Sequence, residues 1–210
     1  MTHTINIIIA CDKGSIVYLD PLINSIYKWM KNPKIYLITD DEVDVKGCLV
    51  VKHENKWNNT LQRVTGHTYH RLFLDEYFPE MDKCIWLDWD TLVVDDISNI
   101  LDGEDWILKA VGEQWFNAGV LCFNFTDECK ELMSKCRELI SSGLNDEQIL
   151  NEVFSKKYNK LPLEYNLFAQ WDDLTKPKII HYVGRQKPWF TNDLYYEWFK
   201  YKSNNLLTWQ

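Results

Sequence analysis

The chain has 210 residues, of which 46% are hydrophobic and 26% are charged, a composition that can bury a full core. Its net charge of -8 argues against an extended phosphate-binding face, so we expect no nucleic-acid partner. No segment approaches the roughly 18 to 20 apolar residues that cross a bilayer, and the six cysteines include no CxxC pair. These features predict a cytoplasmic protein with reduced core thiols.

Strand and helix patterns alternate through the first half of the chain. Apolar runs bounded by turn residues predict strands, and apolar residues at helical spacing predict helices. The predicted order is a strand at 5–10, a helix opened by Pro21, strands at 34–39 and 48–51, a helix at 68–77 and a strand at 84–87. This order predicts an α/β fold with a central, mostly parallel sheet flanked by helices.

The second half is less regular. Its predicted elements are strands at 106–111, 119–124 and 178–182, helices at 128–141 and 147–154, the second capped by Asn145 or Asp146, and a short aromatic helix at 194–201. In open α/β sheets, ligands bind beyond the carboxyl ends of the strands. Asp12 and Asp88 follow two predicted strands, so we expect the site there.

Two aspartates, Asp88 and Asp90, follow the strand predicted at 84–87. In an extended chain, residues two apart point the same way, so both carboxylates would share one side while Trp89 faces the other. Two carboxylates at a buried strand end repel each other and lose hydration, which favours a divalent cation. An acidic turn without a metal is the alternative, since further aspartates follow closely.

Three other segments are candidates for the same site. His181 ends a predicted strand and precedes Gly184 and Lys187, so a turn there could bring an imidazole and an ammonium to one point. Residues 116–120 place an amide and small residues just before a strand, where a ligand can approach the backbone closely. Arg71 lies in a predicted helix. Each also has an explanation without function. His181 could be a surface or core histidine, residues 116–120 a simple turn, and Arg71 a solvated arginine.

Six short segments, in order along the chain, resemble glycosyltransferase family 8, the glycogenin-like and lipooligosaccharide galactosyltransferase-like group with the GT-A fold. In the first half, Ala10-Cys11-Asp12 is similar to the nucleotide loop, Tyr69-His70-Arg71-Leu72 to the donor-contacting helix and Leu87-Asp88-Trp89-Asp90 to the DxD metal motif. In the second half, Phe116-Asn117-Ala118-Gly119-Val120 is similar to the sugar-pocket segment, Asp146-Glu147-Gln148-Ile149-Leu150-Asn151 to the DQxxLN helix start and His181-Tyr182-Val183-Gly184-Arg185-Gln186-Lys187-Pro188-Trp189 to the HxxGxxKPW closing motif.

The resemblance implies an enzyme that moves a hexose or deoxyhexose from a UDP-sugar to a glycan or glycoprotein acceptor, with retention at the anomeric carbon as the family expectation. The metal, Mn2+ or Mg2+, would be held by Asp88, Asp90 and His181. The implied catalytic residues are Arg71, Asp146, Glu147 and Lys187, of which the two basic ones would neutralise phosphate oxygens. The implied donor-binding residues are Ala10, Cys11, Asp12, Ser15, Arg71, Asp88, Trp89, Asn117, Ala118, Gly184 and Lys187.

The resemblance also implies how the chain is organised. We expect one GT-A domain over residues 1–210, with a nucleotide-binding half at 1–95 and a sugar- and acceptor-binding half at 96–210. The chain is short for the family, so it would be either a minimal enzyme or the first domain of a longer protein. The oligomeric state does not follow from the motifs.

Two positions depart from the family pattern. Lys13-Gly14-Ser15 stands where many members have an aromatic residue that stacks on the base, so stacking would come from elsewhere. Glu147 stands where the family has glutamine, which puts an ionisable group where the reactive carbon of the sugar would lie. Glu147 could be a nucleophile, an ion-pair stabiliser or a base, and this leaves inversion open.

Two other functions fit part of the pattern. Asp88-Trp89-Asp90-Thr91-Leu92 also fits the DxDx[TV] loop of haloacid-dehalogenase-type phosphatases, in which Asp88 would be the nucleophile and Mg2+ the metal. That loop usually follows the first strand, whereas about eighty residues of predicted α/β structure precede it here. A non-catalytic module that binds a sugar nucleotide or a glycan would keep the fold and lose the metal cluster, but every expected ligand is present.

Overall fold

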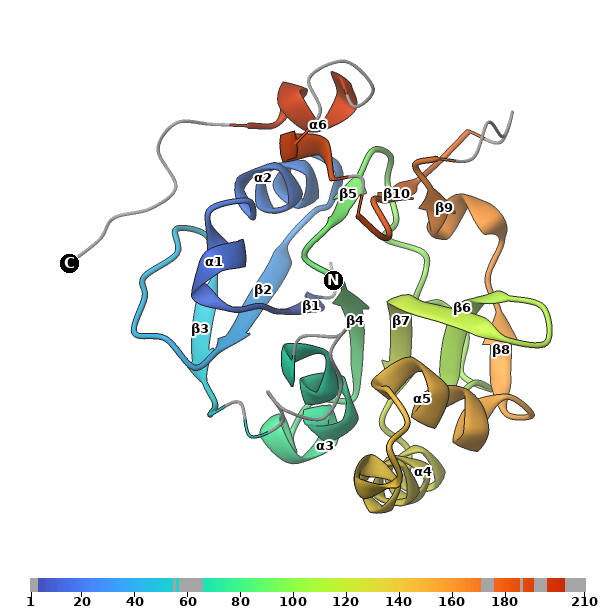
Figure 1. Ribbon diagram of the computed structural model, residues 1–210. Coiled ribbons are helices and arrows are strands. Elements are labelled where there is room, and N and C mark those ends of the chain that lie inside the picture. The colour runs from blue at the N-terminus through green and yellow to red at the C-terminus, as the bar shows by residue number, and fades with distance from the viewer. Residues whose placement is uncertain are drawn as a thin grey trace.

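The structure of the chain is a computed structural model, which describes residues 4–54, 56, 66–170, 176–185, 187–190 and 196–202. Within these residues, seven strands form a central sheet in the order β3-β2-β1-β4-β7-β6-β8 (Figure 1). The strands are β1 Ile5–Ala10, β2 Pro33–Thr39, β3 Leu49–Lys52, β4 Lys83–Leu87, β6 Leu108–Gly112, β7 Phe116–Asn124 and β8 Tyr158–Lys160. The pairs among β1, β2, β3 and β4 are parallel, β7 is antiparallel to β4 and β6, and β8 is parallel to β6. The predicted mostly parallel α/β sheet is confirmed.

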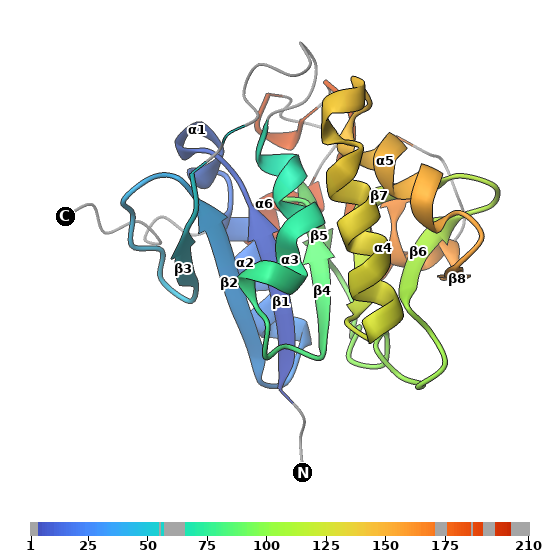
Figure 2. The ribbon, with the colours of Figure 1, turned by 90° about the horizontal axis from the view of Figure 1, so that it is seen from below.

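Helices cover both faces of the sheet (Figure 2). On one face lie α3 Leu74–Tyr77, α4 Asp127–Glu138 and α5 Asp146–Phe154, and on the other lie α2 Asp20–Trp29 and α6 Tyr196–Lys200. The remaining short helices are α1 Lys13–Ile16, η1 Gly66–Phe73, η2 Ile140–Ser142, η3 Leu163–Tyr165 and η4 Pro188–Phe190. None of the helices in the described ranges is both long and apolar enough to cross a membrane.

The central strand β1 is apolar throughout because both of its faces are covered. Ile7 packs on the α2 side of the sheet with Leu22, whereas its neighbour Ile8 packs on the opposite side with Tyr69. Burying each such side chain contributes roughly 1.5 to 3 kcal/mol. The core therefore has two layers, and the strand ends between them are held in fixed positions.

Most predicted elements are found, with ends that shift by up to three residues. Asn145, one of the two predicted caps, accepts a hydrogen bond from the Gln148 amide at 2.8 Å, and the Gln148 side chain accepts one from the Asn145 amide at 3.0 Å. This reciprocal pair begins α5. The helix predicted at 194–201 is described only from residue 196, as α6, and its first two positions lie outside the described residues.

The helix predicted at 68–77 is wrong in its first part, which is the 3-10 helix η1 and becomes α-helical only in α3. The reason is the inward direction of its polar side chains. His70 and Arg71 are buried, and the Arg71 guanidinium donates a hydrogen bond to the Thr68 carbonyl at 2.9 Å. A side-chain bond of this kind competes with the regular helical pattern, so tertiary contacts override the apolar spacing.

A second, smaller sheet was not predicted as a unit. It contains β5 Thr91–Val93, β9 Leu167–Phe168 and β10 Ile179–His181, in the order β5-β10-β9. β10 runs antiparallel to β5, with His181 opposite Thr91, and parallel to β9, with His181 opposite Phe168. Strands this short carry little periodic signal, yet this pairing places His181 beside the turn that follows β4.

The six cysteines are free, and five of them are buried, in agreement with the prediction of reduced core thiols. Burial raises the pKa of Cys122, Cys129 and Cys136 to about 12, with the Asp75 carboxylate adding to the shift at the last two. These thiols therefore stay protonated and behave as small apolar side chains.

His70 is a buried histidine whose charge state couples folding to pH. Its Nδ1 lies 3.0 Å from the Tyr77 hydroxyl, and the His67 and His53 rings lie 5.8 Å and 6.4 Å away. Burial, reinforced by repulsion from these two rings, lowers the pKa of His70 to about 3. The folded protein therefore does not take up the proton that the unfolded chain binds below about pH 6.5.

We expect His70 alone to remove about 1 to 2 kcal/mol of unfolding free energy between about pH 7 and pH 5. The sign follows because a lowered folded pKa gives stability that is present above the unfolded pKa and lost below it. Urea unfolding of the wild type and of His70→Gln at both pH values measures this effect. The glutamine variant should lose less stability than the wild type, and equal losses would contradict the assignment.

Candidate active site

The chain turns sharply at the end of β4, the central strand where the two candidate carboxylates lie. The Thr91 amide and hydroxyl both donate hydrogen bonds to the Asp88 carbonyl, at 3.0 Å and 2.7 Å. Residues 88–90 are therefore a turn between β4 and β5, and the expectation of an extended chain there is wrong. The carboxylates are brought together by the turn and by the strand that pairs with β5, rather than by strand alternation.

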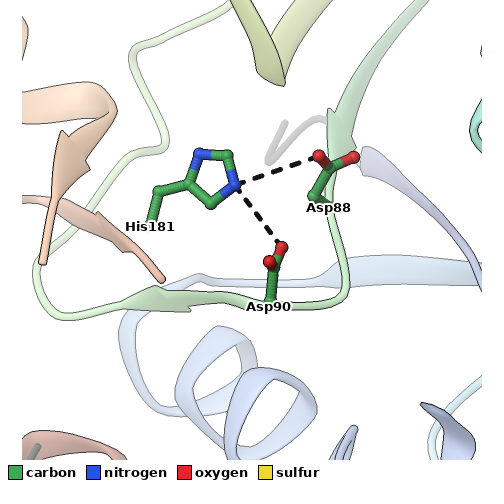
Figure 3. Close-up of side chains that lie close together, drawn as sticks. All are labelled: Asp88, Asp90 and His181. Carbon is green, nitrogen blue, oxygen red and sulfur yellow. Dashed lines mark ion pairs between the residues drawn. The ribbon is translucent and has the colours of Figure 1, made fainter. Parts of the chain in front are cut away.

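Asp88, Asp90 and His181 form a cluster with the donor set of a divalent-metal site. His181 Nε2 lies 3.9 Å from Asp88 Oδ2 and 3.4 Å from Asp90 Oδ1 (Figure 3). One ligand atom from each residue lies within 4.8 Å of the other two. Two carboxylates and an imidazole fit Mn2+ at least as well as Mg2+, and ligand oxygens from a phosphate would complete the coordination.

The two carboxylates of this cluster lie in different electrostatic surroundings. Burial raises the pKa of Asp88, and Asp90 adds to the shift, although the Arg71 guanidinium opposes it. Burial would also raise the pKa of Asp90, but His181 and Lys187 outweigh it and lower the pKa to about 2. The Lys187 ammonium in contact with Asp90 favours the ionised carboxylate, which is the form that binds a metal.

Arg71 is buried, with 2% of its side chain exposed, rather than solvated. Its guanidinium contacts Asp88 at 2.8 Å and Asp146 at 3.1 Å, donates to the Ala118 carbonyl, and lies over the Trp86 ring at 4.7 Å. One side chain thus joins the turn after β4, the start of β7 and the start of α5. Its contact with donor phosphates stays a prediction.

Asp146 and Glu147 are adjacent at the start of α5 but point to different places. Asp146 is buried, accepts a hydrogen bond from the Thr68 hydroxyl at 2.8 Å and pairs with the arginine described above. Glu147 Oε2 accepts hydrogen bonds from Asn117 Nδ2 at 2.8 Å and from the Ala118 amide at 2.9 Å. Asp146 is therefore held inside the protein. Glu147 instead contacts residues 116–120, the segment that resembles the family's sugar pocket.

A pocket of about 530 Å³ opens beside Glu147. Its walls include Asn117, Trp115 and Phe168. Trp115 is 52% exposed, and its Nε1 lies 3.5 Å from Glu147 Oε1. The pocket, which Glu113 and Lys160 also line, thus combines charged side chains with apolar aromatic faces, a pairing that suits the C–H surface and hydroxyl groups of a sugar.

The predicted nucleotide loop follows β1, which neighbours β4 in parallel, so Asp12 and Asp88 lie at the same edge of the sheet. Asp12 caps α1, because its Oδ1 accepts a hydrogen bond from the Ser15 amide at 2.8 Å. Ala10 is buried at the end of β1, and the Cys11 side chain is buried in the core. Any ligand contact of Cys11 would therefore be made by its backbone.

The closing segment lies against the turn after β4. The Lys187 ammonium contacts the Asp90 carboxylate and also donates to the Tyr182 carbonyl at 2.6 Å. The Trp89 and Trp189 rings stack with centroids 4.9 Å apart. Gly184, whose φ is 74°, is exposed in the intervening turn, and residue 186 of the motif lies outside the described residues.

Gly119 and Asn166 shape the site without carrying charge. A Cβ at Gly119 would overlap the His181 ring and lie 2.8 Å from its Nε2, so only glycine leaves room for the imidazole. Asn166 contacts the other ring nitrogen, with its Oδ1 2.9 Å from His181 Nδ1. Gly119 lies in the segment at 116–120, which the sequence had indicated as part of the site, but no sequence pattern indicated Asn166.

Comparisons with known proteins agree with this geometry. Residues 6–105 and 103–193 match the family described as Glycosyl transferase family 8. Glycosyltransferase GlyE of Streptococcus pneumoniae serotype 4 is 28% identical over 197 residues, which cover 77% of this chain and 47% of GlyE. The chain thus spans about half the length of this curated relative.

Two solved structures have similar folds. The apo structure of the bifunctional glycosyltransferase WbbM has a TM-score of 0.78 and 22% identity, with 97% of this chain and 50% of WbbM covered. The galactosyltransferase LgtC, in complex with donor and acceptor sugar analogues, has a TM-score of 0.76 and 19% identity, with 94% of both chains covered. At these identities the likeness shows the fold.

We expect Gly119→Ala to weaken Mn2+ binding by about 10- to 100-fold, the range seen when outer contacts of metal ligands are changed. The added methyl group would push His181 away from the two carboxylates. Isothermal titration with Mn2+ and UDP measures the affinity. Gly103→Ala is the control, since a Cβ there meets only the Trp106 ring at ordinary contact distance, and the strain of its positive φ, 90°, lies away from the site. Unchanged Mn2+ affinity in Gly119→Ala would contradict the assignment.

Proposed function

The chain belongs to glycosyltransferase family 8 and has the GT-A fold, and on that basis we propose that it transfers a hexose or deoxyhexose from a UDP-sugar to a glycan or glycoprotein acceptor, using Mn2+ or Mg2+. The observation that carries this proposal is the cluster of Asp88, Asp90 and His181 at the carboxyl end of β4. In α/β sheets, that is the edge at which ligands bind.

The proposal divides the work between the two halves of the chain. Residues 1–95 would bind the nucleotide, with Asp12 and the backbone around it near the nucleoside. Residues 96–210 would bind the transferred sugar and the acceptor. The basis for this division is that β1 and β4 are parallel neighbours, whereas the pocket beside Glu147 is lined by residues of the second half.

The chemistry requires stabilisation of a leaving group. The bond between the sugar's anomeric carbon and the diphosphate breaks, and negative charge develops on the departing diphosphate. The bound metal would supply Lewis-acid stabilisation of that charge. Lys187 lies at the same point, beside Asp90, and its ammonium would pair with the phosphate oxygens. Arg71, held by Asp88 and Asp146, would keep the metal-binding turn in place.

Glu147 is proposed to act on the sugar. Both donors to its Oε2 come from the sugar-pocket segment, and its carboxylate lines the pocket of about 530 Å³. If its carboxylate attacked the anomeric carbon as the diphosphate left, displacement of the carboxylate by the acceptor hydroxyl would give retention. If it only stabilised the oxocarbenium-like centre, bonding of the acceptor oxygen on the face that the diphosphate leaves would also give retention. If it took the proton of an acceptor hydroxyl that bonds on the opposite face, the product would be inverted. We propose retention as the outcome.

The acceptor is proposed to lie against the aromatic wall of the same pocket. Trp115 and Phe168 present ring faces there, and one carboxylate oxygen of Glu147 lies 3.5 Å from the Trp115 indole nitrogen. Aromatic faces bind the apolar C–H side of a sugar ring while leaving its hydroxyl groups accessible. This supports a glycan or a glycosylated protein as acceptor.

The first test of the proposal concerns the metal. Asp90→Asn should lower Mn2+-dependent UDP release from the best donor in a UDP-sugar panel by at least about 100-fold, because one charged contact to the leaving group's metal is lost. Asp105→Asn, which changes an exposed aspartate, should leave UDP release unchanged.

Three outcomes would contradict the proposal. Full UDP release by Asp90→Asn would remove the metal role. Metal-dependent hydrolysis of p-nitrophenyl phosphate without UDP release would support the phosphatase, and binding of UDP-sugar without turnover would support a non-catalytic module.

The second test concerns Glu147. Glu147→Gln keeps the side-chain length and should bind the donor almost normally, but it removes the charge from the sugar site. We expect turnover to fall at least about tenfold, equivalent to about 1.4 kcal/mol of barrier. Glu152→Gln, on an exposed position of the same helix, is the matched control. If Glu147 only stabilises the first turn of α5, both variants will turn over like the wild type. NMR coupling constants of the product decide between retention and inversion.

A further inference from the structure

A continuous chain of side-chain hydrogen bonds joins the metal-binding histidine to the carboxylate in the sugar pocket. It runs from His181 through Asn166 and Asn117 to Glu147. We propose that Asn166 is a positioning residue that fixes both ends of this chain. The inference rests on the proposed function, since it gives the two ends their roles. It assigns a function to a residue that no motif contains.

The His181 end of the chain determines which ring nitrogen can bind a metal. Asn166 Oδ1 lies 2.9 Å from His181 Nδ1, and Asn166 is 1% exposed, so water does not compete for this bond. A carbonyl oxygen can only accept, so Nδ1 carries the hydrogen. Nε2 is then the ring nitrogen that faces Asp88 and Asp90, and it is the one whose lone pair would bind a metal.

The direction of every bond in the chain follows from its neighbours. Asn117 Oδ1 accepts from the Gly119 backbone amide at 3.0 Å, which identifies that atom as oxygen, because a backbone N–H can only donate. The same Oδ1 lies 2.9 Å from Asn166 Nδ2, which is therefore the donor. Asn117 Nδ2 in turn donates to Glu147 Oε2 at 2.8 Å. These partners determine which atom of each side-chain amide is oxygen and which is nitrogen, and the chain of hydrogen bonds ends on a carboxylate oxygen.

The backbone holds Asn166 in this position. Its amide donates to the Leu163 carbonyl at 3.0 Å, and it immediately precedes β9, which pairs in parallel with β10 beside His181. Gly119 packs against the same imidazole and leaves room for no larger side chain. The imidazole is therefore constrained both by packing and by a directed hydrogen bond, so its orientation does not depend on the metal.

The two ends of the chain respond differently to two substitutions. Asn166→Leu removes both hydrogen bonds of the amide. Asn166→Asp keeps an acceptor for His181 Nδ1, but it presents an oxygen instead of a donor to Asn117 Oδ1. Two oxygens at hydrogen-bond distance repel, so the Asn117 amide must turn and withdraw its donor from Glu147.

The experiment measures Mn2+ affinity and turnover in the full chain, and a separate measurement determines which ring nitrogen of His181 carries the hydrogen. Asn166→Leu should weaken Mn2+ binding in the presence of UDP by about 10- to 100-fold, and turnover should fall with it. Asn166→Asp should bind Mn2+ at least as tightly as the wild type, yet lose at least about tenfold in turnover. A merely structural role of Asn166 would not produce this split between binding and turnover.

A measurement without metal tests the hydrogen bond itself. In protein labelled with 15N at histidine, long-range 1H–15N spectra distinguish the ring nitrogen that carries the hydrogen. The wild type and Asn166→Asp should show a hydrogen on His181 Nδ1, and in Asn166→Leu part of the molecules should carry the hydrogen on Nε2 alone. This readout needs no activity, so it also separates a failure of this inference from a failure of the proposed function.

Asn124→Leu is the matched control for loss of a buried amide. Asn124 is 7% exposed, its Nδ2 donates to the Trp106 carbonyl at 2.8 Å, and it lies at the other end of β7 from the site. It should lower the melting temperature without changing Mn2+ affinity. Unchanged affinity or an unchanged tautomer in Asn166→Leu would overturn the inference, as would equal loss of Mn2+ affinity in Asn166→Leu and Asn166→Asp. A wild type that binds no Mn2+ would overturn the metal role of the site and this inference with it.

Discussion

The repulsion between two carboxylates at the buried end of β4 is the constraint on which the rest of the site depends. Asp88 and Asp90 lie close enough to raise each other's energy, and each is compensated by a cation from a distant part of the chain. Arg71 reaches Asp88 from η1, and Lys187 reaches Asp90 from the closing segment. Removing one partner of such a buried pair costs about 3 to 5 kcal/mol. The elements that bring these cations are therefore fixed to the end of the central strand.

The small second sheet adds a third candidate metal ligand, His181, to the two carboxylates. By pairing with β5, β10 places His181 beside the turn, and the antiparallel register leaves the imidazole between the two carboxylates. The absence of a side chain at Gly119 makes the space for the ring. The three candidate metal ligands are thus oriented by the fold itself, an arrangement that would leave little reorganisation for a reaction at a bound metal.

The start of α5 shows how neighbouring acids acquire separate tasks. Asp146 faces inward and pairs with Arg71, which contacts Asp88, so its contribution is to hold the turn after β4. Glu147, one residue later, faces the pocket and receives two hydrogen bonds from the segment at the start of β7. A helix turns by about 100° per residue, so adjacent side chains necessarily diverge. The carboxylate at position 147, where the family has glutamine, therefore adds charge to the pocket without disturbing the ion pairs behind it.

The sequence by itself determined the order of the main strands and helices, the mostly parallel sheet and the motifs of the site, because apolar periodicity and local capping are short-range properties. Tertiary structure alone decided the rest. The 3-10 form of residues 66–73 follows from the burial of Arg71, and the pairing of β5 with β10 joins segments some ninety residues apart. Asn166 has no local signal at all: it lies between η3 and β9, and only the packing of that turn against β10 and β7 brings it between His181 and Asn117. Long-range hydrogen bonds of this kind depend on the completed packing, which no local pattern encodes.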